Sequence, residues 1–240
     1  MIYVYTANVK SLSEKVSSDE MAFLRMQSVL CEERRKKVQS LKQPADKVRS
    51  LGAGLLLQSA LYEYLSLSVG KRDCGHRDET GMHCVGEIND ETLSNASRMR
   101  KLQIEYGKHE KPYLPEYPGV FFNLSHSGDY VAVAISCHPV GIDIQEKKTL
   151  SEALQDKFFS EGERGSGKPA FYIFSGKESF IKLTGEGMSR SFADFDVDLR
   201  GRTVRDAQSG EILAYVRYKE LDDGNYILCV CDKCRDIIRW

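Results

Sequence analysis

The sequence lacks any long apolar run, because none of its hydrophobic stretches approaches the ~18 residues that a membrane-spanning helix needs. It also lacks the features of a secretory signal, since the apolar residues 2–5 are followed at once by polar ones. A net charge of -1 gives no reason to expect nucleic acid or an anionic membrane as the main partner. These absences predict a cytoplasmic protein, which we expect to be a monomer.

We also expect no disulfide framework, although the chain contains seven cysteines. An odd count without a secretory signal favours reduced thiols. Residues 74–84 contain two cysteines and two histidines that a zinc ion could use, but their spacing matches no familiar zinc motif and their polar neighbours favour a solvated loop. The three cysteines within 229–234 include a C-x-x-C pattern, but the alternation over 226–230 predicts a strand, which favours buried structural thiols over a redox pair.

What is present is typical of a globular protein, with 41% apolar and 29% charged residues and enough length for one large or two modest domains. In the first part, residues 2–5 predict a strand, and apolar residues recur with helical spacing over about 18–37 and from Pro44 to about Leu67. Residues 71–97 have no periodicity, and we expect most of them to form a long loop or a partly ordered insertion.

The second part predicts strands joined by short turns. They are expected at 120–124, 130–136, 140–145, about 194–199, about 213–218 and 226–231. The turns within 120–145 are so short that these strands should be antiparallel neighbours. A capping-box pattern at 160–163 and periodicity over about 170–184 predict helices. The fold is therefore expected to be α+β, with a junction near the extended, proline-bearing segment 111–119.

Three motifs in the second half concentrate polar groups within apolar elements. They read FFNLSHS at 121–127, GIDIQ at 141–145 and GKESFIK at 176–182. Two carboxylates, a histidine and two lysines in such surroundings are costly unless they meet a ligand. The motifs therefore indicate a functional site.

The second and third motifs suit a metal ion. Strand parity places Asp143 and Gln145 on one face, where two oxygen ligands fit Mg²⁺, although a lone Gly-x-Asp more often marks a solvated edge strand. Glu178 and Lys182 lie four residues apart on one helix face, which also fits a surface ion pair. A carboxylate from this helix could complete the metal site or act as a general base.

The first motif suits a phosphate group. Ser125, His126 and the following backbone offer several hydrogen-bond donors in one turn. A lone histidine is more often structural than catalytic, so this interpretation depends on the neighbouring motifs. A basic run at 34–49, with seven basic residues against Asp46, is another potential anion site, although a solvated helix end is the commoner explanation.

The three motifs, in this order and spacing, resemble the 4′-phosphopantetheinyl transferases of the Sfp type. These enzymes move phosphopantetheine from coenzyme A to a serine of a carrier protein. The resemblance implies two similar α/β halves, each an antiparallel sheet packed with helices, with the active site at their junction. We place the boundary so that residues 1–115 and 116–240 form the two halves.

The resemblance also implies roles for individual residues. Glu178 would be a metal ligand and the general base, and Lys182 would contact the pyrophosphate. Asp143 and Gln145 would complete the metal site, and His126 would assist catalysis by holding the phosphates. For coenzyme A, the resemblance implies that Arg49 contacts the 3′-phosphate, with Lys37 as a weaker candidate for the same group. Around the adenine it implies Lys111, Pro112 and Tyr113. The remaining coenzyme A contacts that it implies are Ser125, His126 and Lys182.

The chain departs from the family pattern at two positions. Phe174 replaces a tryptophan, and Gln145 replaces an acid. We therefore expect an Mg²⁺-dependent enzyme, with Mn²⁺ as a possible substitute, that modifies an apo acyl or peptidyl carrier protein and releases adenosine 3′,5′-bisphosphate. Two rivals are a metal-dependent nucleotide pyrophosphate hydrolase, in which water replaces the serine, and a coenzyme A-binding module that has lost catalysis.

Overall fold

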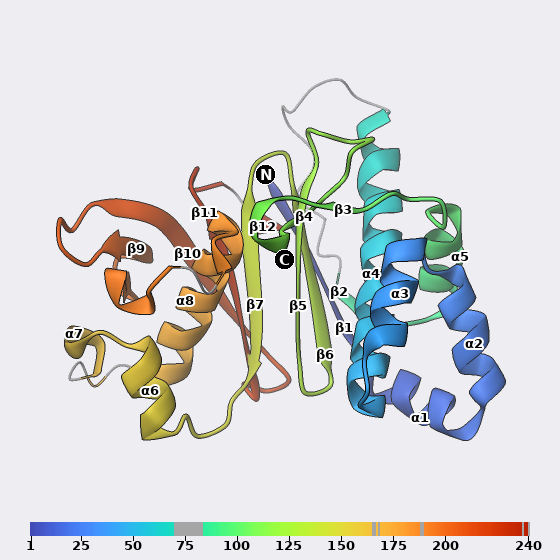
Figure 1. Cartoon of the computed structure of the whole chain (residues 1–240), viewed down its shortest axis with the longest axis horizontal. Helices are drawn as coiled ribbons and strands as arrows, with labels where there is room; N and C mark the ends of the chain where they lie inside the picture. Colours follow the sequence, from blue (N-terminus) through green and yellow to red (C-terminus); the bar gives the residue numbers. More distant parts are fainter. Residues whose placement is uncertain (70–83, 165–166, 168, 188–189, 237, 240) are drawn as a thin grey trace.

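The computed structural model describes residues 1–69, 84–164, 167, 169–187, 190–236 and 238–239. It is a mixed α/β protein in which two antiparallel-rich sheets lie in the middle, with helices on both outer sides (Figure 1). No helix in the described part of the chain is long and apolar enough to cross a membrane. The layers confirm the α+β prediction.

The first sheet has the order β12-β1-β6-β5, with β2 also paired to β1. Its strands are β1 (Ile2–Asn8), β2 (Cys84–Glu87), β5 (Phe121–Ser127), β6 (Tyr130–Ser136) and β12 (Ile238–Arg239). The β1–β6 and β5–β6 pairs are antiparallel, whereas β12 and β2 run parallel to β1. Because Ile2 pairs with Ile238, the two ends of the chain lie together.

Five helices accompany this sheet. They are α1 (Lys10–Ser18), α2 (Glu20–Val29), α3 (Glu32–Ser40), α4 (Pro44–Val69) and α5 (Asp90–Arg98). The helix predicted from Pro44 is confirmed, and its Leu51, Leu55 and Leu57 are fully buried in the core beside the sheet. The apolar stripe of α4 is thus the main cover of this face.

The single helix predicted over 18–37 is wrong, because Leu30 and Cys31 have extended backbones that separate α2 from α3. The buried Gln58 of α4 compensates this break. Its side chain accepts a hydrogen bond from the Cys31 N–H (2.8 Å) and donates one to the Val29 carbonyl (3.1 Å). Backbone groups that leave a helix inside a core need such partners.

The loop predicted over 71–97 is wrong at its end, where β2 and α5 form. Asn89 caps α5 by accepting a hydrogen bond from the Thr92 N–H (2.9 Å), which is a local signal that the sequence contains. Residues 70–83 lie outside the described residues, and so do the side chains that the zinc interpretation would use.

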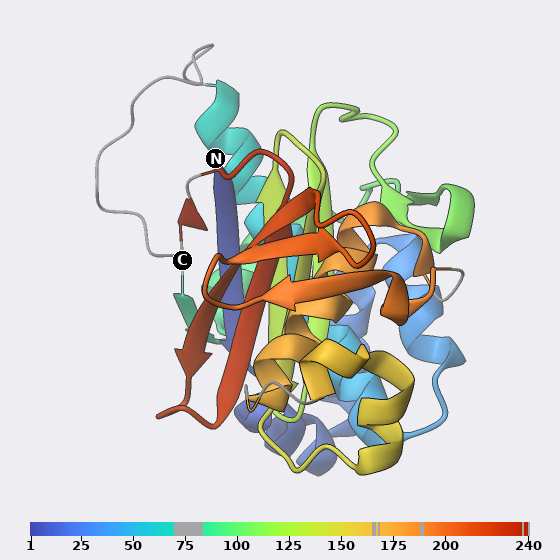
Figure 2. The same ribbon diagram turned by 90° about the vertical axis from the view of Figure 1, so that its left-hand side faces the viewer.

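The second sheet has the order β7-β11-β10-β9-β8, and every neighbouring pair is antiparallel. Its strands are β7 (Val140–Glu146), β8 (Phe195–Asp198), β9 (Thr203–Asp206), β10 (Ile212–Leu221) and β11 (Tyr226–Asp232). The helices on its outer side are α6 (Glu152–Phe158), α7 (Glu161–Arg164), α8 (Ala170–Thr184) and the short η3 (Phe192–Asp194). Figure 2 shows this sheet in front of the first, with α6 below it.

The prediction that β6 and β7 are antiparallel neighbours is wrong. The chain leaves the first sheet after Ser136 and enters the second at Val140, where β7 pairs with β11. The physical reason is burial: Ile142 and Ile144 pack in a core shared by both sheets, which also contains Ile2 and Val4. A division of the chain at 115/116 stays a prediction, and the change of sheet lies within 137–139.

A small hairpin connects the N-terminal helices to β5. It consists of β3 (Glu105–Tyr106), the turn η1 (Lys108–Glu110) and β4 (Pro112–Tyr113). The Gly107 N–H donates to the Lys111 carbonyl across the turn (2.9 Å).

Candidate active site

The edges of the two sheets meet along β5 and β7, and the first motif forms the contact. Side chains of β5 replace the usual backbone ladder: the Asn123 amide oxygen accepts from the Ile142 N–H (2.9 Å), the Ser125 hydroxyl from the Ile144 N–H (3.2 Å) and the Ser127 hydroxyl from the Glu146 N–H (3.0 Å). Alternation along β5 therefore directs one set of residues to β7. The other set, including Leu124 and His126, faces the helical side.

Asp143 lies at the centre of this seam and is 1% exposed. Its Oδ1 accepts from Lys182 Nζ (2.7 Å) and the Ser125 hydroxyl (3.0 Å), and its Oδ2 accepts from Gln145 Nε2 (3.0 Å). Lys182 Nζ also donates to Ser125 Oγ (2.9 Å). Polar side chains buried this deeply need such hydrogen-bond partners.

Close packing of α8 on β7 sets the position of Lys182 and Glu178. A side chain at Gly141 would place its Cβ 1.9 Å from the Ser179 carbonyl oxygen and 2.6 Å from the Leu183 nitrogen. Only glycine permits this approach of helix and strand, which brings the Glu178–Lys182 face of α8 toward Asp143. The glycine of the second motif is therefore a requirement of the site.

Glu178 is half-buried beside Asp143. Burial raises its pKa above the ordinary value of 4.5, the negative charge of Asp143 raises it further, and Lys182 opposes both. Two carboxylates side by side favour a shared cation, and a carboxylate with a raised pKa also accepts a proton more readily.

The chemistry of the donors fits a hard cation such as Mg²⁺ only in part. Asp143 and Glu178 supply carboxylates, and Gln145 supplies an amide whose oxygen would face the ion after rotation of the group. Among the described residues, no three His, Cys, Asp or Glu side chains lie together as a metal cluster. With Gln145 in place of an acid, two carboxylates remain.

Positive charge gathers on the other side of β5. Arg49 pairs with Asp46 (2.6 Å) and donates to the Gly128 carbonyl (3.4 Å), so it lies beside the turn that follows the first motif. Desolvation of the imidazole, together with the charges of Arg49, Lys182 and Arg34, lowers the pKa of His126. A histidine surrounded by cations is neutral at pH 7 and suits an anionic ligand.

A cavity of about 470 Å³ opens in the same region. It is lined by Arg34, Lys37, Ile104, Tyr106, Glu110, Pro112, Phe122 and Leu124. Its size and its mixture of cations with apolar walls fit a phosphorylated nucleoside.

Arg34 is the functional candidate that the sequence analysis missed. Its Nη2 donates to the Ser50 carbonyl (3.0 Å), but its buried Nε has no partner in the described part of the chain, and burial lowers its pKa. An unpaired guanidinium nitrogen beside a cavity indicates an anion site. The only sequence signal was its place in the basic run on α3, which does not distinguish it from Arg35 or Lys36.

Other predicted coenzyme A contacts are distributed unevenly. Lys37 and Pro112 line the cavity. The Lys111 ammonium instead donates to the Leu183 carbonyl at the end of α8 (2.5 Å), and burial lowers its pKa to about 8. Tyr113 donates to Glu105 and is exposed. The structure thus brings Lys37 and Pro112 to the cavity, and it places the Lys111 and Tyr113 side chains elsewhere.

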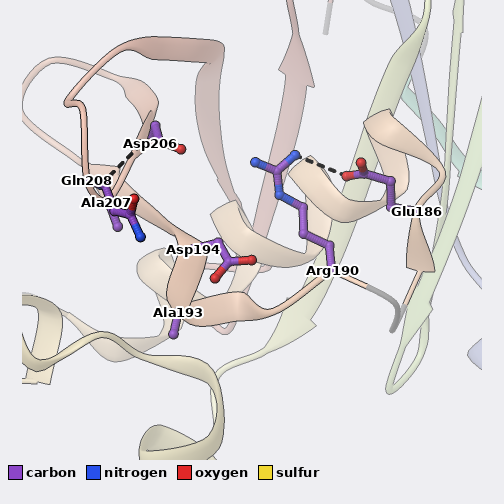
Figure 3. A pocket seen from close by; sticks show the side chains of 7 residues that line it. All are labelled: Glu186, Arg190, Ala193, Asp194, Asp206, Ala207 and Gln208. Atoms are coloured by element: carbon purple, nitrogen blue, oxygen red, sulfur yellow. Dashed lines mark hydrogen bonds and ion pairs between the residues drawn. The ribbon is translucent and has the colours of Figure 1, made fainter.

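A separate polar cavity of about 550 Å³ lies beyond the end of α8 (Figure 3). Its side chains include Glu186, Arg190, Asp194 and Asp206, and Arg190 pairs with Glu186 at 3.0 Å. None of the three motifs contributes to it, so we do not assign the reaction to this cavity.

Comparisons with known proteins agree with the motifs. Residues 139–231 match the model of the 4′-phosphopantetheinyl transferase superfamily. The chain is 30% identical to 4′-phosphopantetheinyl transferase ffp of Bacillus subtilis and 31% identical to Sfp of B. subtilis strain 168, in both cases over 170 residues, 65% of this chain and 75% of the relative. It is 36% identical to psf-1 of Bacillus pumilus over 146 residues, 56% of this chain and 62% of the relative.

Proposed function

The chain belongs to the 4′-phosphopantetheinyl transferase family and transfers the phosphopantetheine group of coenzyme A to carrier proteins, and we propose that the seam between β5 and β7 is where it does so. The observation that carries this proposal is the arrangement of Asp143, Glu178 and Lys182 around one point of the seam. A cavity of nucleotide size, with Arg34 and Lys37 in its lining, lies beside β5, whose Phe122 and Leu124 also line it.

Asp143, Glu178 and Gln145 would hold a divalent cation, with Mg²⁺ as the preferred ion because all three donors are oxygens. When bound, the cation supplies positive charge at the pyrophosphate oxygens. Lys182 would lie against the same oxygens, since its ammonium is already held at Asp143 and its side chain is 27% exposed. His126 would donate a hydrogen bond to a phosphate from the other side of β5.

The carboxylate of Glu178 would take the proton of the carrier serine. The serine oxygen then attacks the β-phosphorus, the bond between this phosphorus and the bridging oxygen breaks, and adenosine 3′,5′-bisphosphate leaves with the electron pair. Charge that grows on the leaving oxygen would be stabilised by Lys182. The reaction balances without any further reactant.

The nucleotide half of coenzyme A would occupy the cavity beside α3 and β5. Arg34 and Lys37 would contact the 3′-phosphate, with Arg49 close to the same group at the Gly128 turn. Pro112 would lie against the adenine. In this arrangement Lys111 has a structural role, because its ammonium donates a hydrogen bond to a carbonyl at the C-terminus of α8.

The function is tested by incubating the protein with an apo carrier protein, coenzyme A and Mg²⁺, and then weighing the carrier by mass spectrometry. We expect a phosphopantetheine adduct that forms only while a divalent cation is present, so that EDTA stops the transfer and added Mg²⁺ or Mn²⁺ restores it. Release of adenosine 3′,5′-bisphosphate without any carrier would instead support the rival hydrolase. A transfer rate that EDTA leaves unchanged would contradict the metal assignment.

Gln145→Glu should strengthen metal binding. The side chain already lies 3.0 Å from Asp143 Oδ2, and glutamate has nearly the same shape but adds a negative charge to the two carboxylates. Titration calorimetry with Mg²⁺ should show tighter binding by this variant in the absence of coenzyme A, whereas the parent protein should need coenzyme A for tight binding. Equal affinities would place Gln145 outside the metal shell. Gln155→Glu, on α6, is the control for a general effect of charge.

A further inference from the structure

The cavity beside α3 contains one feature that a phosphate site does not explain. Glu110 lines it together with the cations Arg34 and Lys37. A carboxylate repels phosphate, so its presence in a phosphate-binding cavity calls for a hydrogen-bond donor on another part of the ligand. The side chain of Glu110 makes no hydrogen bond to the described part of the chain, which leaves its oxygens available to a ligand.

The backbone holds Glu110 in place at some cost. His109 and Glu110 have positive φ values of 59° and 60°, a left-handed conformation that non-glycine residues rarely adopt. The hairpin maintains it through the Gly107–Lys111 hydrogen bond (2.9 Å) and through Lys111, whose ammonium is anchored to Leu183 of α8 (2.5 Å). Two hydrogen bonds thus hold the turn that carries the Glu110 carboxylate.

The walls of the cavity indicate which part of a ligand Glu110 meets. Apart from the charged residues, the cavity is lined by Ile104, Tyr106, Pro112, Phe122 and Leu124. Apolar and aromatic surfaces of this kind accommodate a planar base, and Pro112 is only two residues from Glu110. An adenine base carries an amino group at its edge, and this group is a hydrogen-bond donor.

We infer that Glu110 accepts a hydrogen bond from the exocyclic amino group of the adenine of coenzyme A, and so determines the base specificity of the enzyme. This inference rests on the proposed function. It concerns a residue that none of the three motifs includes and that supplies the only carboxylate among the residues lining the cavity in the described part of the chain.

The test compares coenzyme A with an analogue in which hydrogen replaces the 6-amino group of adenine. For the parent protein we expect the KM of the analogue to be about tenfold higher than that of coenzyme A, because a hydrogen bond to a charged acceptor is lost. In Glu110→Ala this ratio should fall to about one, since the acceptor is absent for both substrates. Glu110→Gln keeps an acceptor oxygen and should retain a ratio above that of the alanine variant.

Each outcome decides a separate question. If the parent protein modifies the carrier but treats the two substrates alike, Glu110 does not bind the amino group, and a ribose hydroxyl becomes the alternative donor. If Glu110→Ala raises both KM values by the same factor, the residue only stabilises the turn, and the inference is wrong. Absence of transfer from coenzyme A by the parent protein contradicts the proposed function itself. Glu116→Ala, an exposed acid outside the cavity, should keep the parental ratio.

Discussion

Glu178→Gln is expected to lower kcat by about a thousandfold, which is the middle of the range for loss of a positioned general base. Glutamine keeps the size of the side chain and its hydrogen-bonding oxygen, but it cannot take the proton of the carrier serine. It also removes one of the two carboxylates available to a metal ion. The KM for coenzyme A should change much less, because the nucleotide cavity is formed by other residues.

The pH dependence follows from the raised pKa of Glu178. In the parent protein, kcat should fall as the pH drops through this raised value, because the carboxylate becomes protonated and can no longer act as a base. The residual activity of Glu178→Gln should lack this limb of the profile. Stopped assays of carrier modification across the pH range, with coenzyme A at saturation, measure both effects.

The free energy of unfolding should respond to pH in the opposite direction to kcat. The folded protein holds the protonated form of Glu178 more tightly than the unfolded chain, so this group favours folding fully below pH 4.5 and loses that contribution as the pH rises through the folded pKa. At pH 8 Glu178→Gln should therefore melt no lower than the parent protein. Glu161→Gln, at an exposed position, is the matched control. Full activity of Glu178→Gln would assign the base to another residue.

The proximity of several candidate site residues could be predicted because much of their geometry is local. Strand alternation placed Asp143 and Gln145 on one face, and a spacing of four placed Glu178 and Lys182 on one helix face. The resemblance to a transferase family then joined these faces into one site. The residues Asp143, Ser125 and Lys182 do contact one another in the fold.

What could not be predicted depends on contacts between distant segments. The short turn at 137–139 is typical of a hairpin, yet the chain uses it to pass from one sheet to the other, because burial of Ile142 against the shared core outweighs pairing with β6. Arg34 differs from its basic neighbours only because it is buried under α4. Neither fact is encoded in a local spacing.

Lys177 is the clearest case in which sequence position misleads. It precedes Glu178 in the third motif and has the charge that a phosphate ligand needs, but it is fully buried. Its ammonium contacts Glu163 (2.8 Å) and donates to the carbonyl oxygens of Phe192 and Phe195 (2.6 Å each). Glu163 in turn accepts hydrogen bonds from the Val197 and Ser160 N–H groups. The pair joins α7, α8 and β8.

Lys177→Met should therefore destabilise the protein by about 3–5 kcal/mol, because it removes the ammonium that pairs with the buried Glu163 carboxylate and that donates to two buried carbonyls. For a chain of this size that corresponds to a fall in Tm of roughly 6–20 °C. Combining it with Glu163→Gln should recover part of the loss, since neither member of this buried pair is then charged. Lys233→Met, at an exposed lysine of the same half, should leave Tm unchanged. Thermal unfolding followed by circular dichroism gives the Tm of all four proteins. If Lys177→Met keeps the parental Tm but loses transfer activity, Lys177 acts in the reaction and does not stabilise the fold.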